Sequence, residues 1–364
     1  MKEAFIQRLS AMLAAILLYN SALTGSPLPK MNLQDTSKNK SEVIPKPVQS
    51  VTQHKLTAGG INISYTATAG TLIVRNSKDL PYASIGYFAY IRNDVTDPGR
   101  RPITFAYNGG PGYPSIWLNM GSLGPKRILT NDPSFIPPPP YKVVDNIYSI
   151  LDKTDLIMID AVGTGISVVA GESKDKDFWS VDCDIESFAR FIRQYITENG
   201  RWNSPKYLLG ESYGTTRSAG IVDYLQRNEG MSFNGVILVS VATDLGMVFD
   251  DSQGYDFGAL FTLPTYTAVA WYHKVLPDPP SDMSQLLKEV SDFALGEYSK
   301  ALAQGNNLAD SVRSKIIDKL HLYTGISKDY IDKSNLRIPS AQFANQLLNR
   351  SEEHTSELQS RQVI

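Results

Sequence analysis

The stretch from Lys206 to Gln226 constrains this chain more than any other. Lys206–Leu209 is a short apolar run that predicts a buried strand, and Thr215–Gln226 predicts a helix. Between them stands Gly-Glu-Ser-Tyr-Gly, which fits the pattern G-x-S-x-G. A strand that turns sharply into a helix at such a pentapeptide exposes its serine, and the helix N-terminus favours developing negative charge. We therefore predict that Ser212 is a nucleophile rather than part of a chance match in a glycine-rich chain.

Strands that alternate with helices are predicted on both sides of this turn. The chain begins with two expected antiparallel strands, His54–Ala67 and Thr71–Asn76, with glycine breaks at 59–60 and 70. Apolar runs then predict further strands at Ala83–Arg92, Pro102–Tyr107, Thr154–Asp160 and Gly235–Ser240, and a helix at Asp182–Asn199. This order indicates an α/β fold with a mostly parallel central sheet that is covered on both faces.

A second glycine-rich segment, Asn-Gly-Gly-Pro-Gly at 108–112, follows one of these strands. A serine that attacks a carbonyl group needs N–H donors aimed at the oxyanion. In a strand–serine–helix turn one donor is the N–H after the serine, here that of Tyr213, and the other comes from a loop after an early strand. Glycines let such a loop approach a substrate closely. The segment is thus a candidate oxyanion loop, and the alternative is an ordinary Gly-Pro turn.

These two motifs, with Val-Gly-Thr-Gly at 162–165 between them, resemble the serine carboxypeptidase family over roughly residues 57–348. The resemblance implies an α/β-hydrolase fold and the release of C-terminal residues from peptides through an acyl-enzyme. It implies that the N–H groups of Gly110 and Tyr213 form the oxyanion hole. It also implies that Asn108, Gly109 and Glu211 bind the terminal carboxylate of the substrate.

Two further expectations follow from the resemblance. Glu211 and a substrate carboxylate would repel each other if both were ionised, so they can lie in contact only if they share a proton. We therefore expect peptidase activity to favour acidic pH. Tyr113-Pro114 stands where plant and yeast members have cysteine and serine, and Ala106 stands where they have tryptophan. The chain therefore resembles a bacterial branch of the family.

A general base for Ser212 is not evident. In this architecture an Asp or Glu and then a His follow the serine, on late loops of the sheet. Only His273, His321 and His354 follow Ser212. His273 lies in an aromatic stretch, and His321 is expected to pack or cap on a helix. We expect neither to be the base, and we expect the triad Asp and His to be missing from this chain.

The C-terminal part of the chain departs from the strand–helix pattern. Residues 250–348 predict a helical insertion or cap, with amphipathic helices at Ser284–Gln304 and Leu308–Thr324. Arg350–Ser360 resembles the translation of a sequencing adapter, so residues 349–364 are expected to be an artefactual or disordered tail. We therefore expect the C-terminal part of the sheet to be missing and the chain to be an incomplete, inactive fragment.

The N-terminus predicts a secretory signal peptide at residues 1–25. Lys2 and Arg8 form a positive n-region before a short apolar run, Leu9–Leu18, and small residues follow that run. An uncleaved anchor is the alternative. Residues 26–50 are polar and predict a disordered linker before an α/β core at 51–249. We expect a secreted or periplasmic protein with no stable membrane partner after cleavage.

Composition narrows the remaining function classes. The formal net charge of −2 gives no argument for nucleic acid, and the single cysteine, Cys183, leaves no internal disulfide. There is no H-E-x-x-H, no cysteine pair and no G-x-x-x-x-G-K-[ST], so we expect no metal and no cofactor. The expected partners are peptides with a free C-terminal carboxylate. An esterase or acyltransferase on the same scaffold, or a binding protein that lost catalysis, are the alternatives.

Overall fold

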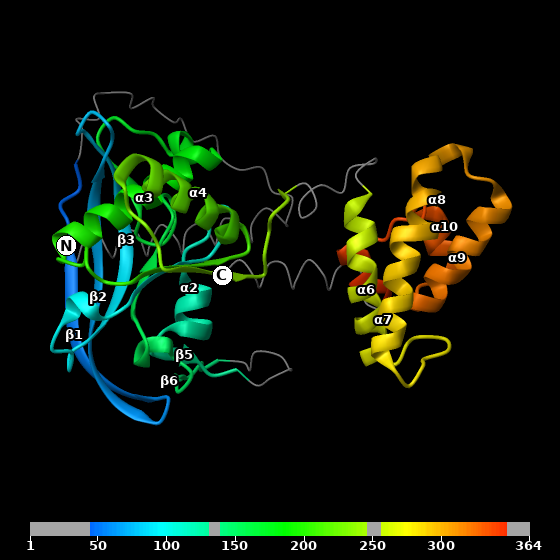
Figure 1. Ribbon diagram of the computed structural model, residues 1–364, viewed down its shortest axis with the longest axis horizontal. Coiled ribbons are helices and arrows are strands. Elements are labelled where there is room, and N and C mark those ends of the chain that lie inside the picture. Colours follow the sequence, from blue (N-terminus) through cyan, green and yellow to red (C-terminus); the bar gives the residue numbers. More distant parts are fainter. Residues whose placement is uncertain (1–43, 131–138, 246–255, 348–364) are drawn as a thin grey trace, which may run out of the picture. The chain divides into compact units, whose positions relative to one another are not determined.

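The computed structural model describes residues 44–130, 139–245 and 256–347 (Figure 1). The predicted signal segment at 1–25, the adapter-like tail and His354 lie outside these residues. The predicted linker at 26–50 overlaps the first strand, which begins at Gln49, two residues before the predicted core. Residues 44–245 and 256–347 each have a hydrophobic core of their own.

An eight-stranded sheet organises residues 44–245, in the order β1-β2-β3-β7-β4-β9-β10, with β8 pairing to β3 outside this path. β1, β2, β3 and β7 pair antiparallel, whereas β7, β4, β9 and β10 pair parallel. The strands are β1 (Gln49–Ala58), β2 (Ile61–Arg75), β3 (Pro81–Arg92), β4 (Ile103–Tyr107), β7 (Asp155–Ile159), β8 (Val168–Val169), β9 (Lys206–Glu211) and β10 (Gly235–Val239). The sheet confirms the predicted fold class, antiparallel at its N-terminal side and otherwise parallel.

The central strands are buried on both faces, which explains their continuous apolar sequences. Along β4, Phe105 and Tyr107 belong to the core that includes helices α3 (Val181–Glu198) and α4 (Tyr213–Glu229). Ala106 between them belongs to a separate cluster on the opposite face. Figure 1 shows α3 and α4 beside each other against the sheet. The two helices therefore cover one face of the sheet.

The opposite face is covered by shorter elements. Helix α2 (Ile116–Leu118) contributes Leu118 to the cluster there, and a π-helical turn at Asn119–Leu123 follows it. A separate two-stranded antiparallel sheet that the sequence did not predict consists of β5 (Lys126–Ile128) and β6 (Val143–Asp145). Single 3₁₀ turns lie at Pro98–Arg100 and Ile150–Asp152, and a third at Asp175–Phe178 contributes Phe178 to the core on the α3 and α4 face.

Gly70 was predicted to separate the strands His54–Ala67 and Thr71–Asn76, and this prediction was wrong. β2 runs through Gly70 and pairs it with Tyr87 of β3. A Cβ atom at Gly70 would lie 3.0 Å from the Tyr87 hydroxyl oxygen, so the glycine makes room for that ring. The actual turn of the hairpin is at Gly59 and Gly60, which have φ of 57° and 78°. Here glycine signals a turn only where the backbone needs positive φ.

Residues 256–347 are helical, as predicted. Tyr298 and Phe293 belong to their core, and Pro264 lies within the first helix. The predicted helix at Ser284–Gln304 is one run that widens into a π turn at Ala294–Tyr298. The helices are α6 (Phe257–Tyr272), α7 (Met283–Phe293), α8 (Ser299–Gln304), α9 (Asp310–Thr324), α10 (Lys328–Lys333) and α11 (Ser340–Leu347), with a 3₁₀ turn at Gly305–Asn307.

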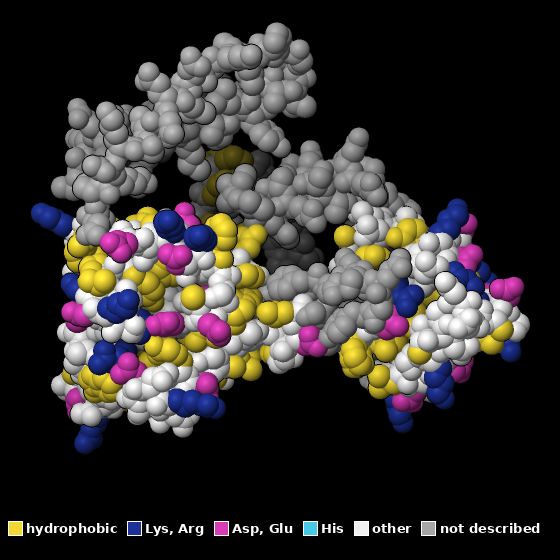
Figure 2. All heavy atoms as spheres, turned by 90° about the horizontal axis from the view of Figure 1, so that it is seen from above, with side chains coloured by type: hydrophobic (Ala, Val, Ile, Leu, Met, Phe, Trp, Pro, Cys, Tyr) yellow, Lys and Arg dark blue, Asp and Glu magenta, His cyan; other side chains and the backbone are white. Residues whose placement is uncertain are grey.

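Two surface properties apply to the described residues. None of their helices has the length and apolar character that a membrane crossing requires. On the face seen in Figure 2, the Lys and Arg side chains are interspersed with Asp and Glu side chains among hydrophobic ones. The described surface seen there therefore has no continuous field of one charge.

Candidate active site

Ser212 lies at the turn between β9 and α4, with φ of 56° and ψ of −124°. Residues with a Cβ atom rarely adopt this backbone conformation, so the turn is strained. Gly210 and Gly214 permit it, because a Cβ atom at Gly210 would lie 2.1 Å from the Gly214 carbonyl oxygen. The Ser212 N–H donates to the carbonyl of Val239 at the end of β10, at 2.9 Å. The predicted strand–serine–helix turn is therefore present and is tied to the neighbouring strand.

The glycine loop after β4 packs directly on this turn. A Cβ atom at Gly109 would lie 2.5 Å from the Tyr213 nitrogen and 2.6 Å from the Glu211 carbonyl oxygen. Any larger residue would push the loop away from the serine. The sequence predicted that residues 108–112 and the turn meet, and the structure brings their backbones together.

Asn108 and Glu211 are joined by hydrogen bonds. The Asn108 Nδ2 donates to Glu211 Oε2 at 3.0 Å, and the Gly109 N–H reaches the same oxygen at 3.4 Å. The Asn108 Oδ1 accepts the N–H of Leu118 at 3.0 Å, which fixes the orientation of the amide. Asn108 is only 4% exposed. The two side chains therefore form one rigid polar group beside Ser212.

These residues line a pocket of about 540 Å³, called here the serine pocket. Its wall combines the polar group with Tyr113 and Trp117, whose side chains are both exposed at the mouth. Its lining residues are Asn108, Gly109, Gly110, Tyr113, Trp117, Leu118, Ser122, Glu211, Ser212 and Val239. The pocket thus offers a nucleophile, carboxyl and amide groups, and an aromatic rim.

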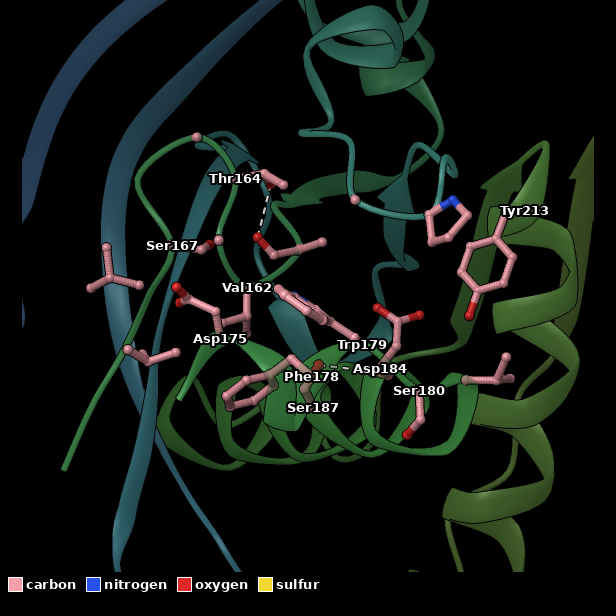
Figure 3. Close-up of a pocket in the computed structure, with 18 of the residues that line it drawn as sticks. Val162, Thr164, Ser167, Asp175, Phe178, Trp179, Ser180, Asp184, Ser187 and Tyr213 are labelled. Carbon is pink, nitrogen blue, oxygen red and sulfur yellow. Dashed lines mark hydrogen bonds between the residues drawn. The ribbon is translucent and has the colours of Figure 1, made fainter. Parts of the chain in front are cut away.

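A second pocket of about 940 Å³ lies beyond Pro111 and Gly112, where the glycine loop continues. Its lining includes the Val-Gly-Thr-Gly loop at 162–165, the residues before α3, and Tyr213. Figure 3 shows Trp179 and Asp184 on the α3 side of this pocket and Tyr213 on the α4 side. Trp179 is 78% exposed, which leaves its indole ring free to stack on a ligand. Tyr213 therefore stands next to both the serine and this second pocket.

A buried ion pair lies behind Tyr213. Arg217 is fully buried, and its Nε and one terminal nitrogen donate to the two carboxylate oxygens of Asp184, at 2.7 and 3.1 Å. Its other terminal nitrogen donates to the Asn108 carbonyl oxygen at 2.7 Å. Burial raises the pKa of Tyr213 to about 12, and the Asp184 charge adds to this shift, so the phenol stays neutral.

Asp160 follows the last residue of β7 and is 3% exposed. Its Oδ1 accepts the N–H of Ser115 at 2.8 Å, and the Ser115 hydroxyl donates to the Ile159 carbonyl. A Cβ atom at Gly165 would lie 2.1 Å from Asp160 Oδ2. Burial raises the pKa of Asp160 to about 6, and the Ser115 hydrogen bond opposes part of that shift. Asp160 therefore connects the segment after the glycine loop with the Val-Gly-Thr-Gly loop.

No histidine of the described chain lines either pocket. His321 Nδ1 bonds to the Ile326 carbonyl at 2.7 Å, as expected for a capping residue, and His273 is exposed at the end of α6. The part of the chain described here therefore supplies a nucleophile and donors around it, but no histidine base at the serine pocket.

Sequence reasoning missed Asp184, Arg217 and Asp160. In the sequence, Asp184 lies in the first turn of a predicted helix, where the helix dipole already favours an acidic residue and no partner is required. Arg217 was the detectable signal, because it occupies the same four-residue spacing as the buried Tyr213 and Ile221 on α4. An arginine within a buried stripe requires an acidic partner.

Several solved structures are similar to this chain. The Kex1Δp prohormone-processing carboxypeptidase from Saccharomyces cerevisiae is 18% identical, with 71% of this chain and 53% of that chain covered and a TM-score of 0.42. Proline iminopeptidase from Mycobacterium smegmatis is 14% identical, with 68% of this chain and 59% of that chain covered and a TM-score of 0.29. The rice cell wall degrading esterase LipA from Xanthomonas oryzae is 11% identical, with 79% of this chain and 78% of that chain covered and a TM-score of 0.33.

This chain thus spans about half the length of the yeast carboxypeptidase. A search of curated proteins found no match. The sequence itself shows the family. The model of the family described as serine carboxypeptidase matches residues 78–362, well over half of the chain. That match includes the glycine loop, the Val-Gly-Thr-Gly loop and the serine turn, on a sheet of the α/β-hydrolase type. The chain belongs to the serine carboxypeptidase family.

Proposed function

We propose that the protein is a serine-type carboxypeptidase that releases C-terminal residues from peptides. One observation carries the proposal: the strained Ser212 shares its pocket with the hydrogen-bonded pair of Asn108 and Glu211. Ser212 attacks the last peptide carbonyl, and the N–H groups of Gly110 and Tyr213 hold the oxyanion. The leaving amino acid departs, and water then hydrolyses the acyl-enzyme.

The amide and the carboxyl group define where the end of the peptide binds. Asn108 Nδ2 is a donor for the terminal carboxylate of a substrate, and Glu211 binds it when one proton lies between the two carboxyl groups. The leaving residue therefore occupies the serine pocket, against Tyr113 and Trp117. The acyl part extends past Tyr213 into the second pocket, against Trp179. Activity is then expected to fall as the pH rises and that shared proton is lost.

The general base belongs to the same proposal. Because the described residues bring no histidine to the serine pocket, we propose that a segment following Leu348 in the complete gene supplies the Asp and the His. Sequencing the genomic locus past Leu348 tests this. A reading frame that continues through an Asp and then a His in late strand–loop contexts supports it, and a stop codon directly after residue 364 contradicts it.

A substrate pair tests the activity. The protein encoded by the complete gene is given an N-blocked dipeptide with a free carboxylate, and the same dipeptide as its C-terminal amide. We expect the free acid to be hydrolysed at least about tenfold faster, because only it uses Asn108 and Glu211. Replacing Ser212 by Ala is expected to lower kcat about 10⁶-fold. Equal rates on the acid and on small esters would indicate an esterase or acyltransferase, and binding without turnover would indicate a binding protein.

The place of action is a separate proposal. The basic and apolar character of residues 1–18 supports secretion or export to the periplasm. Fractionation of the cells that express the full chain, with N-terminal sequencing of the mature protein, tests it. A mature N-terminus near residue 25 supports export, whereas an intact Met1 in the cytosol contradicts it.

A further inference from the structure

The side chain of Arg217 joins three segments that meet behind the serine pocket. Two of its nitrogens bind Asp184 on α3, and the third binds the main-chain oxygen of Asn108 in the glycine loop. Arg217 itself lies on α4, the helix that begins at Tyr213. One guanidinium group thus connects α3, α4 and the loop that carries Asn108 and Gly109.

The guanidinium is also enclosed by aromatic rings. Its central carbon lies 4.1 Å from the centroid of the Phe188 ring, 5.3 Å from that of Tyr107 and 5.2 Å from that of Tyr213. These distances are in the range of cation–π contacts. A flat, charged group with a fixed fork of donors fits this space, whereas the ammonium group of lysine cannot reproduce both bonds to Asp184 and the bond to Asn108.

The bond to Asn108 sets the orientation of one peptide plane. The Asn108 carbonyl oxygen and the Gly109 N–H belong to the same peptide group and point in opposite directions. Arg217 holds the oxygen on the buried side, and the N–H faces Glu211 Oε2. A bond to a charged donor also polarises that peptide group, which strengthens its N–H as a donor. The next N–H along the chain is that of Gly110.

We propose that Arg217, held by Asp184, is a positioning residue that fixes the Asn108–Gly109 peptide for recognition of a terminal carboxylate. The carboxylate site itself is that of the proposed function, on which this inference rests. Arg217 touches no substrate and acts through the backbone of Asn108. Asp184 balances the charge of the arginine and sets its rotation, so loss of Asp184 has the same consequence.

The test measures binding and turnover separately. The probes are an N-blocked phenylalanine and its amide for calorimetric binding, and the dipeptide acid and amide described above for turnover. In the wild-type protein we expect the acid to bind about tenfold tighter than the amide. In Arg217→Lys and in Asp184→Asn we expect this preference to fall to about twofold. We also expect kcat/KM for the dipeptide acid to fall about 100-fold in Arg217→Lys, since small misplacements of a binding group have effects of that size.

A matched control exists at another buried arginine. Arg201 is 4% exposed, and it binds the carboxylate of Asp155 and the main-chain oxygen of Arg101, at 2.7 and 3.0 Å. Arg201→Lys therefore removes the same kind of bonds at a site that lines neither pocket. We expect it to lower the melting temperature but to leave the preference for acid over amide unchanged.

Three results would overturn the inference. The preference could survive in folded Arg217→Lys and Asp184→Asn, the control could lose it equally, or the wild-type protein could bind acid and amide alike. Should Arg217→Lys fail to fold, Asp184→Asn alone decides, because asparagine keeps the size of the side chain. The binding arm also separates the two proposals: turnover that is absent while the preference for acid remains contradicts the proposed enzyme but not the role of Arg217.

Discussion

The two ends of β7 carry buried carboxylates in opposite surroundings. Asp155, the first residue of the strand, is 1% exposed and accepts from Arg101 and Arg201, at 2.8 and 2.7 Å. Asp160, the residue after the strand, is 3% exposed, and no cation of the described chain pairs with it. The two carboxylates are therefore similarly buried, but two guanidinium groups balance the charge of Asp155, whereas burial raises the pKa of Asp160 to about 6.

The contrast separates support from function along a single sheet. At the amino end of the parallel strands, charges are paired so that segments far apart in sequence stay together. At the carboxyl end lie Ser212 and Asn108, where β9 and β4 end, and the carboxyl group of Glu211 lines the serine pocket with them. In open parallel sheets, ligand sites generally lie outside the carboxyl ends of the strands. Changes at the two ends should therefore have different consequences.

The largest expected effect is on stability, at the amino end. Asp155→Asn leaves two buried guanidinium groups without a countercharge and should lower the free energy of unfolding by about 3–5 kcal/mol. Urea denaturation measures it. Asp223→Asn, which breaks an exposed pair with Arg227, is the control and should stay within about 0.5 kcal/mol. Equal losses in the two variants would remove the distinction between the buried cluster and a surface pair.

At the carboxyl end we expect a pH-dependent effect from Asp160. Its pKa is about 6 in the folded chain and about 4 when unfolded, so the folded state holds the proton more tightly between these values. The associated stability is present below about pH 4 and is lost as the pH rises through 6, a change of about 3 kcal/mol for two pKa units. Asp160→Asn cannot titrate, so its free energy of unfolding relative to the wild type should rise by that amount from pH 4 to pH 7.5. A difference that stays constant with pH would contradict the raised pKa.

Selectivity should change at the carboxyl end alone. Trp179→Ala removes an exposed aromatic side chain from the second pocket. For dipeptide acids, we expect the ratio of kcat/KM for a phenylalanine over an alanine in the acyl position to fall about tenfold, or about 1.4 kcal/mol. Trp202→Ala is the matched control, since Trp202 is also exposed but lines neither pocket. An equal change in both variants would place the acyl part elsewhere.

The smallest expected effect concerns the cap of α3. The Ser180 hydroxyl accepts the N–H of Cys183 at 3.2 Å, at the helix start that carries Asp184. Ser180→Ala should lower the free energy of unfolding by about 1 kcal/mol, and Ser180→Asp should restore it. Thermal denaturation of the three proteins measures this. If Ser180→Asp were as unstable as Ser180→Ala, the cap would not contribute to the helix.

Local signals made much of the fold predictable from the sequence. β4 and β9 were identified because each is a short apolar run bounded by glycine or proline, and the turn at Ser212 because its glycines are close in sequence. The meeting of Ser212 with residues 108–112 followed from the order of elements in such a sheet. Each of these needs only neighbours in the sequence and a general rule of topology.

The buried ion pairs were not predictable in the same way. Arg217 and Asp184 lie on different helices, and a charged residue on a helix gives no information about which distant residue it meets. Gly70 was misread because its reason is the Tyr87 ring on the next strand, which the local sequence does not show. These residues escaped prediction because their side-chain contacts join segments that the chain brings together only on folding.

The backbone strain at Ser212 places selection for function against selection for stability. Positive φ costs an L-residue about 1–3 kcal/mol, and glycine alone avoids that cost. A glycine at this position would therefore give a sturdier protein without a nucleophile. A screen for resistance to heat alone would be expected to select that replacement, so the strain at Ser212, with its φ of 56°, is the loss of stability that comes with a hydroxyl group at this turn.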